Sequence, residues 1–181
     1  MSEAKKEPYY NNTIFVFYGD HGISGYAGEH VHKGEGSNGY GLGELRVPFI
    51  IYSPLIKERK TYEKVISETD VLPSIASMAG ISYTATTIGR DIFDKRFDDK
   101  RYAFTIHHSS NPTIGLIGSK YYFRTNYDGS SESLFDIYSE EPLVNHAKEN
   151  AELTKKMREI TFGIFETSKY IPYFNKREDA Q

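Results

Sequence analysis

Two runs of β-branched and aromatic residues stand out near the start of the chain, at 13–18 and 47–52. Neither run alternates with polar residues, so both predict strands buried on both faces, as in a parallel sheet covered by helices. A glycine-rich stretch separates the two runs, and apolar residues at helical spacing follow over 69–79. Strand, loop, strand and helix in this order predict an α/β sheet.

The predicted helix over 69–79 carries signals at both ends. Thr69 or Asp70 can cap its first turn, and Gly80 suits the left-handed backbone position just past its last turn. The residues expected to face the core share one helical stripe: Leu72, Ile75, Ala76 and Ala79.

After residue 100 the pattern changes to short apolar runs separated by turn residues, which predicts an antiparallel meander. The predicted strands are 102–107, 113–117, 120–126 and 132–138. From about residue 150 to 168, one stripe of apolar residues predicts an amphipathic helix that covers this sheet. The stripe consists of Leu153, Met157, Ile160 and Ile164.

These patterns divide the chain into three segments. Residues 1–12 are polar and predict a flexible leader. Residues 13–100 are expected to form the α/β core region, and residues 101–181 an antiparallel subdomain with a terminal helix.

Composition narrows the classes of function. The 15 Tyr and 11 Phe make the chain 14% aromatic, which favours a folded core over disorder. A net charge of −3 with thinly spread Lys and Arg excludes a generally basic nucleic-acid binder. No apolar run approaches the ~20 residues that span a bilayer, so the chain is predicted to be soluble and without a signal sequence. Zero cysteines exclude disulfides, thiolate metal sites and cysteine nucleophiles.

Asp20 and His21 directly follow the first predicted strand, at the carboxyl end where open α/β sheets place their ligands. A carboxylate oxygen beside an imidazole nitrogen suits a divalent cation, and the flanking Gly19 and Gly22 let the backbone turn around it. A stable site needs about four to six donors, so further ligands must come from elsewhere. The same dipeptide also fits a turn in which Asp20 caps the backbone beside a solvated His21.

Three more ionisable residues, His30, His32 and Lys33, lie in the glycine-rich stretch between the two strands. An ammonium group and imidazoles can bind an anionic ester and offset its charge, which suits sulfate or phosphate chemistry. A solvated surface lysine is the alternative. His107 and His108 end a later predicted strand, where a turn with one buried ring is favoured over a metal site.

Four sequence blocks, in this order, resemble the sulfatase and alkaline phosphatase superfamily, which includes the lipoteichoic acid synthase-like phosphoglycerol transferases. The blocks are the strand that ends in Gly19-Asp20-His21-Gly22, the Glu44-Leu45-Arg46-Val47-Pro48 segment, the Thr69–Gly80 helix with Gly89-Arg90-Asp91, and the run Leu134-Phe135-Asp136-Ile137-Tyr138 with Asn145. The resemblance implies the C-terminal portion of an alkaline-phosphatase-like α/β sandwich. A small antiparallel sheet and a C-terminal amphipathic helix would follow.

The resemblance also implies roles for individual residues. Asp20 and His21 would be ligands of a divalent metal ion, Ca, Mn or Mg. Lys33, with His30 and His32, would bind the anionic group of the substrate. The nucleophile of this superfamily lies upstream of its Asp-His-Gly strand, so it is expected to be absent from this chain.

By the same resemblance, the chain is expected to be part of a metal-dependent sulfatase-like hydrolase that cleaves sulfate esters. A phosphoglycerol transferase or phosphatase of the superfamily is the first alternative, and a non-catalytic structural module is the second. The expected partners are a sulfate or phosphate ester and the missing N-terminal half of the same enzyme, which would act outside the cytoplasm, exported or membrane-anchored. Without that half, the chain is expected to be inactive and to self-associate through an unpaired strand edge.

Overall fold

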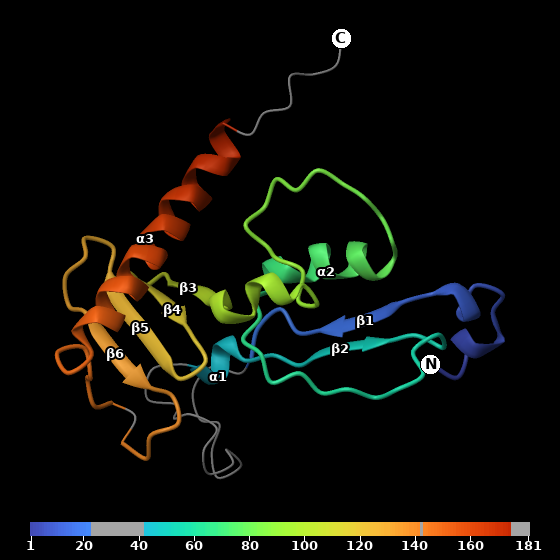
Figure 1. Ribbon diagram of the computed structural model, residues 1–181, viewed down its shortest axis with the longest axis horizontal. Coiled ribbons are helices and arrows are strands. Elements are labelled where there is room, and N and C mark those ends of the chain that lie inside the picture. Colours follow the sequence, from blue (N-terminus) through green and yellow to red (C-terminus); the bar gives the residue numbers. More distant parts are fainter. Residues whose placement is uncertain (23–41, 142, 175–181) are drawn as a thin grey trace. The chain divides into compact units, whose positions relative to one another are not determined.

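The computed structural model describes residues 1–22, 42–141 and 143–174 (Figure 1). The described residues form two compact units, 1–22 with 42–63, and 64–174 without residue 142. Both units combine short helices with antiparallel strands, and a long helix, α3, ends the second unit. The predicted fold class, an α/β region followed by a small antiparallel sheet and a C-terminal helix, is confirmed.

The first unit is built on a two-stranded sheet of β1 (Phe15–Tyr18) and β2 (Phe49–Tyr52), with a short helix α1 (Leu42–Leu45) before β2. The strands pair antiparallel, Phe15 opposite Tyr52 and Tyr18 opposite Phe49. The predicted parallel pairing with both faces buried is therefore wrong for these two strands. Several of their apolar side chains lie at the surface, namely Phe17, Tyr18, Ile50 and Tyr52.

The predicted flexible leader, residues 1–12, contains two 3-10 helices, η1 (Ala4–Lys6) and η2 (Tyr10–Asn12). Tyr10 is buried, and its ring packs against Phe15 and Tyr52 with centroid separations of 5.8 and 6.4 Å. The hydroxyls of Tyr10 and Tyr52 are hydrogen-bonded to each other. The end of this segment thus contributes aromatic packing to the start of the ribbon.

The second unit begins with a 3-10 turn, η4 (Glu68–Asp70), that leads into helix α2 (Val71–Met78). Gly80 has φ +66°, so the predicted left-handed stop is confirmed. The predicted start differs, because Asp70 does not cap α2 with its side chain and instead accepts hydrogen bonds from the backbone N–H of Ser67 at 3.0 Å and of Arg90 at 2.7 Å.

The buried face of α2 agrees with the predicted stripe at Ala76 but not at Leu72. Leu72 is 59% exposed, whereas Pro73, Ser74 and Ala76 are buried. Hydrogen bonds explain why Ser74 faces inward. Its hydroxyl donates to the carbonyl of Asp70 and accepts from the N–H of Ile92 at 3.0 Å. Together with the bond from Arg90 to Asp70, these bonds join α2 to the segment after it, so the two parts of the third sequence block are held together.

After a 3-10 segment, η5 (Lys95–Lys100), the chain forms the predicted meander with strand order β3-β4-β5-β6. All neighbours are antiparallel. The strands are β3 (Ala103–His107), β4 (Thr113–Ile117), β5 (Tyr121–Asn126) and β6 (Ser133–Asp136). Helix α3 (Ala151–Phe174) crosses one face of this sheet (Figure 1).

The core of the second unit lies between the sheet and α3. One row of directly paired residues, Phe104, Leu116, Phe123 and Leu134, runs across the four strands. Met157 of α3 is buried against this row, and the rest of the predicted stripe packs around it, namely Leu153, Ile160 and Ile164. The predicted covering helix is thus confirmed in its position and in the face it buries.

The fourth sequence block has a structural role in this unit. The Asn145 side chain bonds to the backbone at three points, donating to the Glu132 carbonyl and accepting from the N–H groups of Leu134 and Ala147, each at 3.0 Å. The Leu134 carbonyl in turn accepts from the N–H of His146 at 2.8 Å. Through these hydrogen bonds Asn145 holds the segment after β6 along the outer edge of that strand.

Candidate functional site

The strongest candidate site in the described residues is the turn that leaves β1. Gly19 continues the pairing with the β2 side, since its N–H donates to the carbonyl of Pro48 at 3.4 Å. A Cβ added at Gly22 would lie 2.0 Å from the carbonyl oxygen of Gly43 and 3.2 Å from that of Arg46. The Asp-His-Gly turn is thus packed against the backbone of the Glu44-to-Pro48 block, and two of the sequence blocks meet in space.

Asp20 and His21 project from this turn into solvent, with side chains 91% and 79% exposed. The two side chains are close, since the distance from His21 Nε2 to Asp20 Oδ1 is 4.0 Å. The backbone N–H of His21 also donates to Asp20 Oδ1 at 3.1 Å. Both side chains are therefore accessible and lie close to each other.

A hydrogen bond fixes the state of the His21 ring. Its Nδ1 lies 2.7 Å from the carbonyl oxygen of Gly22, and because a carbonyl only accepts, Nδ1 carries the proton. In the neutral ring the lone pair is then on Nε2, the nitrogen near Asp20. This is the arrangement of metal-binding histidines, whose second nitrogen donates to a carbonyl or carboxylate.

The same surroundings shift the titration of the ring. The hydrogen bond to the Gly22 carbonyl, followed by the charge of Asp20, raises the pKa of His21 above its ordinary value. Both effects favour positive charge at this corner, as expected for a position beside a carboxylate. A bound cation would supply that charge in place of the proton.

The donor set fits a divalent cation in part. A hard carboxylate oxygen and a borderline imidazole nitrogen are available within one turn, but the described residues contain no group of three or more His, Asp or Glu placed to hold an ion. The predicted anion-binding residues His30, His32 and Lys33 lie outside the described residues. The metal site therefore stays a prediction, carried by Asp20 and His21.

The second histidine pair lies at the end of β3. Nε2 of His107 is buried and has no hydrogen-bond partner among the described residues. His108 is exposed, and its Nδ1 lies 3.4 Å from the hydroxyl of Tyr127. His107 is half-buried at the end of β3 and His108 is exposed, so the two rings differ in their access to solvent.

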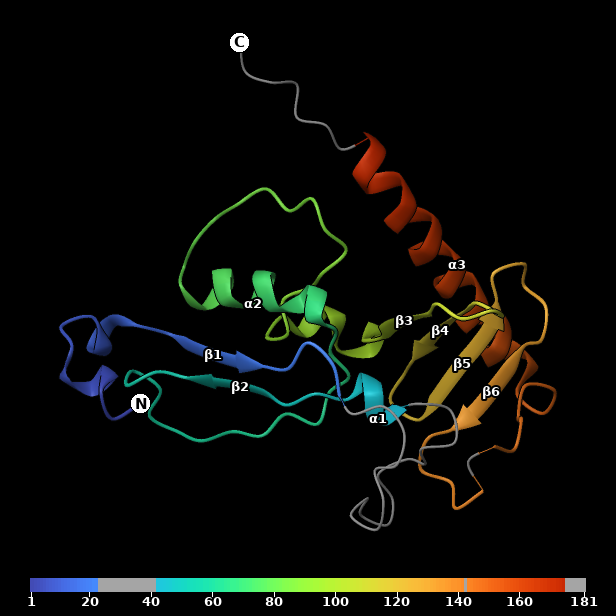
Figure 2. The same ribbon diagram turned by 180° about the vertical axis from the view of Figure 1, so that it is seen from behind.

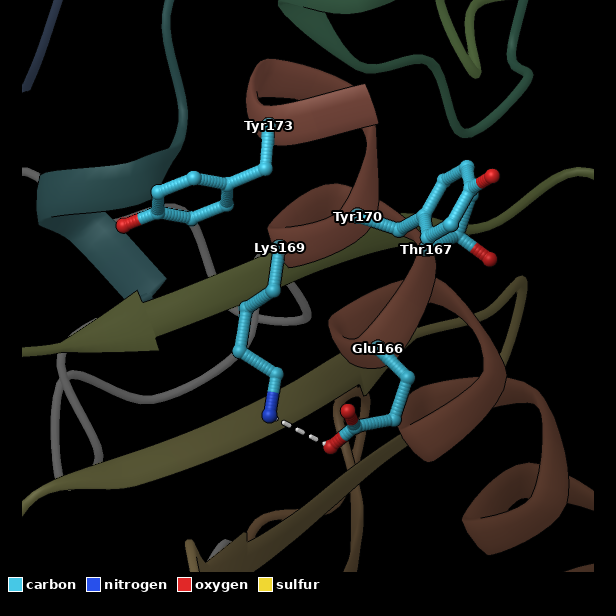
Figure 3. A pocket seen from close by; sticks show the side chains of 5 residues that line it. All are labelled: Glu166, Thr167, Lys169, Tyr170 and Tyr173. Carbon is cyan, nitrogen blue, oxygen red and sulfur yellow. Dashed lines mark hydrogen bonds and ion pairs between the residues drawn. The ribbon is translucent and has the colours of Figure 1, made fainter. Parts of the chain in front are cut away.

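A pocket of about 530 Å³ lies along the last turns of α3 and is lined by Glu166, Thr167, Lys169, Tyr170 and Tyr173 (Figure 3). Its two charges neutralise each other, since Lys169 Nζ lies 2.6 Å from Glu166 Oε1. The ammonium also lies over the ring of Phe165, 4.4 Å from its centroid. Paired charges and exposed tyrosines give this pocket no group poised for chemistry.

Comparisons with known proteins support the family resemblance that the sequence motifs indicate. The sulfatase family model matches residues 1–81, which include both the Asp-His-Gly turn and the whole of α2. An arylsulfatase of Clostridium perfringens (strain 13 / Type A) is 35% identical over 95 residues, which make up 48% of this chain and 18% of that protein. Each of these two sequence matches thus covers about half of the chain.

Solved structures extend the likeness to nearly the whole chain. A 2-O GAG sulfatase superposes on 98% of this chain with a TM-score of 0.65 and 22% identity, and 41% of that structure is covered. The lipoteichoic acid synthase LtaP from Listeria monocytogenes matches 95% of this chain and 41% of its own, with a TM-score of 0.57 and 14% identity. At these identities the structural matches establish the fold.

The fold of the chain is therefore similar to part of the fold of the solved sulfatases. Together, the structural and sequence matches confirm the resemblance to the sulfatase and alkaline phosphatase superfamily. The chain spans less than half the length of the relatives it matches and fits the C-terminal portion of their fold. None of the described helices combines the length and the apolar character needed to cross a membrane.

Proposed function

We propose that this chain is the C-terminal part of a metal-dependent sulfatase-like hydrolase that cleaves sulfate esters. The observation that carries the proposal is the turn after β1, where the exposed Asp20 carboxylate lies 4.0 Å from the Nε2 atom of His21. This turn lies inside the segment matched by the sulfatase family model. The partner that completes the site is the N-terminal half of the same enzyme, which would supply the remaining ligands and the nucleophile.

In this proposal a divalent ion, Ca, Mn or Mg, supplies polarisation of the ester and activation of the nucleophile. Asp20 provides an anionic oxygen ligand and His21 provides Nε2. The carbonyl of Gly22 keeps the His21 proton on Nδ1 and so keeps Nε2 available. Lys33, with His30 and His32, would bind the anionic group of the substrate and offset its charge.

The first alternative is a phosphoglycerol transferase or phosphatase of the same superfamily. It is favoured by the structural match to LtaP, whose TM-score of 0.57 is not far below the 0.65 of the sulfatase. The sulfatase branch is preferred because both sequence matches, the family model and the arylsulfatase, belong to it. We further propose that the complete enzyme acts outside the cytoplasm, exported or membrane-anchored, as the resemblance implies.

Metal binding by the chain itself tests the role of Asp20 and His21. We expect Mn²⁺ to broaden the amide NMR signals of residues 19–22, because an unpaired-electron ion held by the two side chains lies next to these amides. Asp20→Ala should weaken this effect at least about tenfold, since it removes the only anionic donor of the pair. Ca²⁺ and Mg²⁺ should compete with Mn²⁺ for the same signals.

Asp99→Ala is the matched control, because Asp99 is an exposed aspartate that belongs to the second unit and is not part of the turn. It should leave the broadening at residues 19–22 unchanged. Equal Mn²⁺ affinity in the wild-type and Asp20→Ala chains would contradict the metal role. It would favour the second alternative, a non-catalytic module in which the turn is only structural.

The chain alone is expected to show no turnover of nitrophenyl sulfate or nitrophenyl phosphate, because the proposed nucleophile belongs to the other half of the enzyme. The measurement is release of nitrophenol with saturating Mn²⁺, Ca²⁺ or Mg²⁺, against a buffer blank. Turnover above the blank that is lost in Asp20→Ala would place a complete active site in this chain. The division of the enzyme proposed here would then be wrong.

A further inference from the structure

The turn after β1 is bounded by two glycines, Gly19 and Gly22, and one short segment of the chain contacts both of them. This segment, residues 43–47, runs from α1 to the start of β2 and lies at the same end of the ribbon as the turn (Figure 1, Figure 2). At its start the backbone of Gly43 lies against Gly22, and at its end the side chain of Val47 lies against Gly19. The proposed metal ligands therefore stand between two contacts with the same segment.

Val47 occupies the space that a side chain at position 19 would need. A Cβ built on Gly19 would lie 3.2 Å from both Cβ and Cγ1 of Val47. Carbon atoms in optimal contact are about 3.5–4.0 Å apart, so the missing side chain of Gly19 is what lets Val47 come this close. The N–H of Gly19 also donates to the carbonyl of Pro48 at 3.4 Å. The Val47-Pro48 dipeptide thus holds Gly19 through both a side chain and the backbone.

Val47 is itself a rigid residue. The proline that follows it disfavours helical backbone at position 47 and favours an extended conformation. Its branched Cβ restricts the side chain to few rotamers. Glycine, by contrast, has more backbone freedom than any other residue, and it stands on both sides of the Asp20-His21 pair. A stiff residue therefore limits the movement of a flexible one directly beside a proposed metal ligand.

We propose that Val47 is a positioning residue of the metal site, which acts by fixing the Gly19 end of the turn and with it the place of the Asp20 carboxylate. This inference rests on the proposed role of Asp20 and His21 as metal ligands. The Val47 side chain has no donor atom and does not bind the ion. Its effect is preorganisation, because ligands that are already held in place need no further ordering when the ion binds.

A comparison of two valine-to-alanine variants tests this role. Val47→Ala should weaken Mn²⁺ binding about tenfold, measured by broadening of the amide NMR signals of residues 19–22, although both proposed ligands are intact. Val16→Ala is the matched control, because Val16 is also half-buried in the first unit but lies within β1. It should lose similar stability and keep the Mn²⁺ affinity of the wild type. Val47→Thr, which keeps the branched shape, should keep that affinity too, and circular dichroism should show that all three variants are folded.

A second measurement needs no metal ion. Hydrogen exchange of the Gly19 and His21 amides should be faster in Val47→Ala than in Val16→Ala or Val47→Thr, because the turn loses its support at Gly19. Equal exchange and equal Mn²⁺ affinity in the two alanine variants would overturn the role of Val47 and leave the metal site itself intact. Broadening that is absent in the wild-type chain would instead overturn the proposed metal site, and with it the role of Val47.

Discussion

Phe123→Ala should destabilise the second unit by about 3–5 kcal/mol, the usual cost of removing a fully buried aromatic ring from a core. Phe123 is 0% exposed and stands at the centre of the row that crosses the sheet, directly opposite Leu116 on one side and Leu134 on the other. Met157 of α3 closes the same cluster. An alanine would leave a cavity bounded by strands on both sides and a helix above, and such a site cannot collapse easily.

Urea unfolding followed by circular dichroism at the helix signal measures this loss, because α3 depends on the cluster for its packing. Tyr173→Ala is the control, since Tyr173 lies on the exposed part of α3 and should change stability by less than about 0.5 kcal/mol. A loss below about 1 kcal/mol in Phe123→Ala would mean that α3 is not held by this row. The fold as described would then be wrong at its core.

The second unit is also the part of the fold that the sequence predicted best. Strand 113–117 matches β4 residue for residue, and the helical stripe that contains Met157 packs on the sheet as expected. The reason is that short apolar runs between turn residues and an apolar stripe on a long helix are local patterns, and neighbouring strands pair in sequence order. Local patterns suffice where contacts follow the order of the chain.

The sequence failed where distant or polar contacts decide the structure. A continuous apolar run predicts a strand, but it does not reveal whether its partner runs parallel or antiparallel, and β1 and β2 were assigned the wrong direction for that reason. On α2, hydrophobic periodicity placed Leu72 inside, whereas the hydrogen bonds of Ser74 turn another face inward. Hydrophobic periodicity depends on apolar residues alone, so it cannot predict that a hydrogen-bonded serine is buried.

The candidate site shows the same division. The position of Asp20 and His21 at a strand end follows from the residue pattern, and the structure places them there. The residue pattern does not predict that this turn packs against the backbone at Gly43. Gly22 and Gly43 are far apart in the sequence, and glycine is frequent throughout the stretch between them. Only the folded chain reveals that one of these glycines is needed for a close backbone contact.

The close backbone contact at Gly22 predicts the second large effect of a mutation on stability. Gly22→Ala should destabilise the first unit by about 1–3 kcal/mol, the range for forcing an extra methyl group into an occupied space. The new Cβ would lie 2.0 Å from the Gly43 carbonyl oxygen, and both partners are backbone, so no side-chain rotation relieves the clash. The turn must move away from the Arg46 side, which shifts the Gly22 carbonyl that holds the His21 ring.

Two readouts separate this effect from general unfolding. Hydrogen exchange in β1 should speed up while β4 and β5 keep their protection, because the turn belongs to the first compact unit. Broadening of the amide NMR signals of residues 19–22 by Mn²⁺ should weaken although both proposed ligands are intact.

Gly163→Ala is the control, since its Cβ meets nothing within 4 Å and an alanine in α3 should stabilise the helix by up to about 1 kcal/mol. Unchanged exchange in Gly22→Ala would show that the turn is not packed on α1, and the geometry that orients His21 would lose its basis.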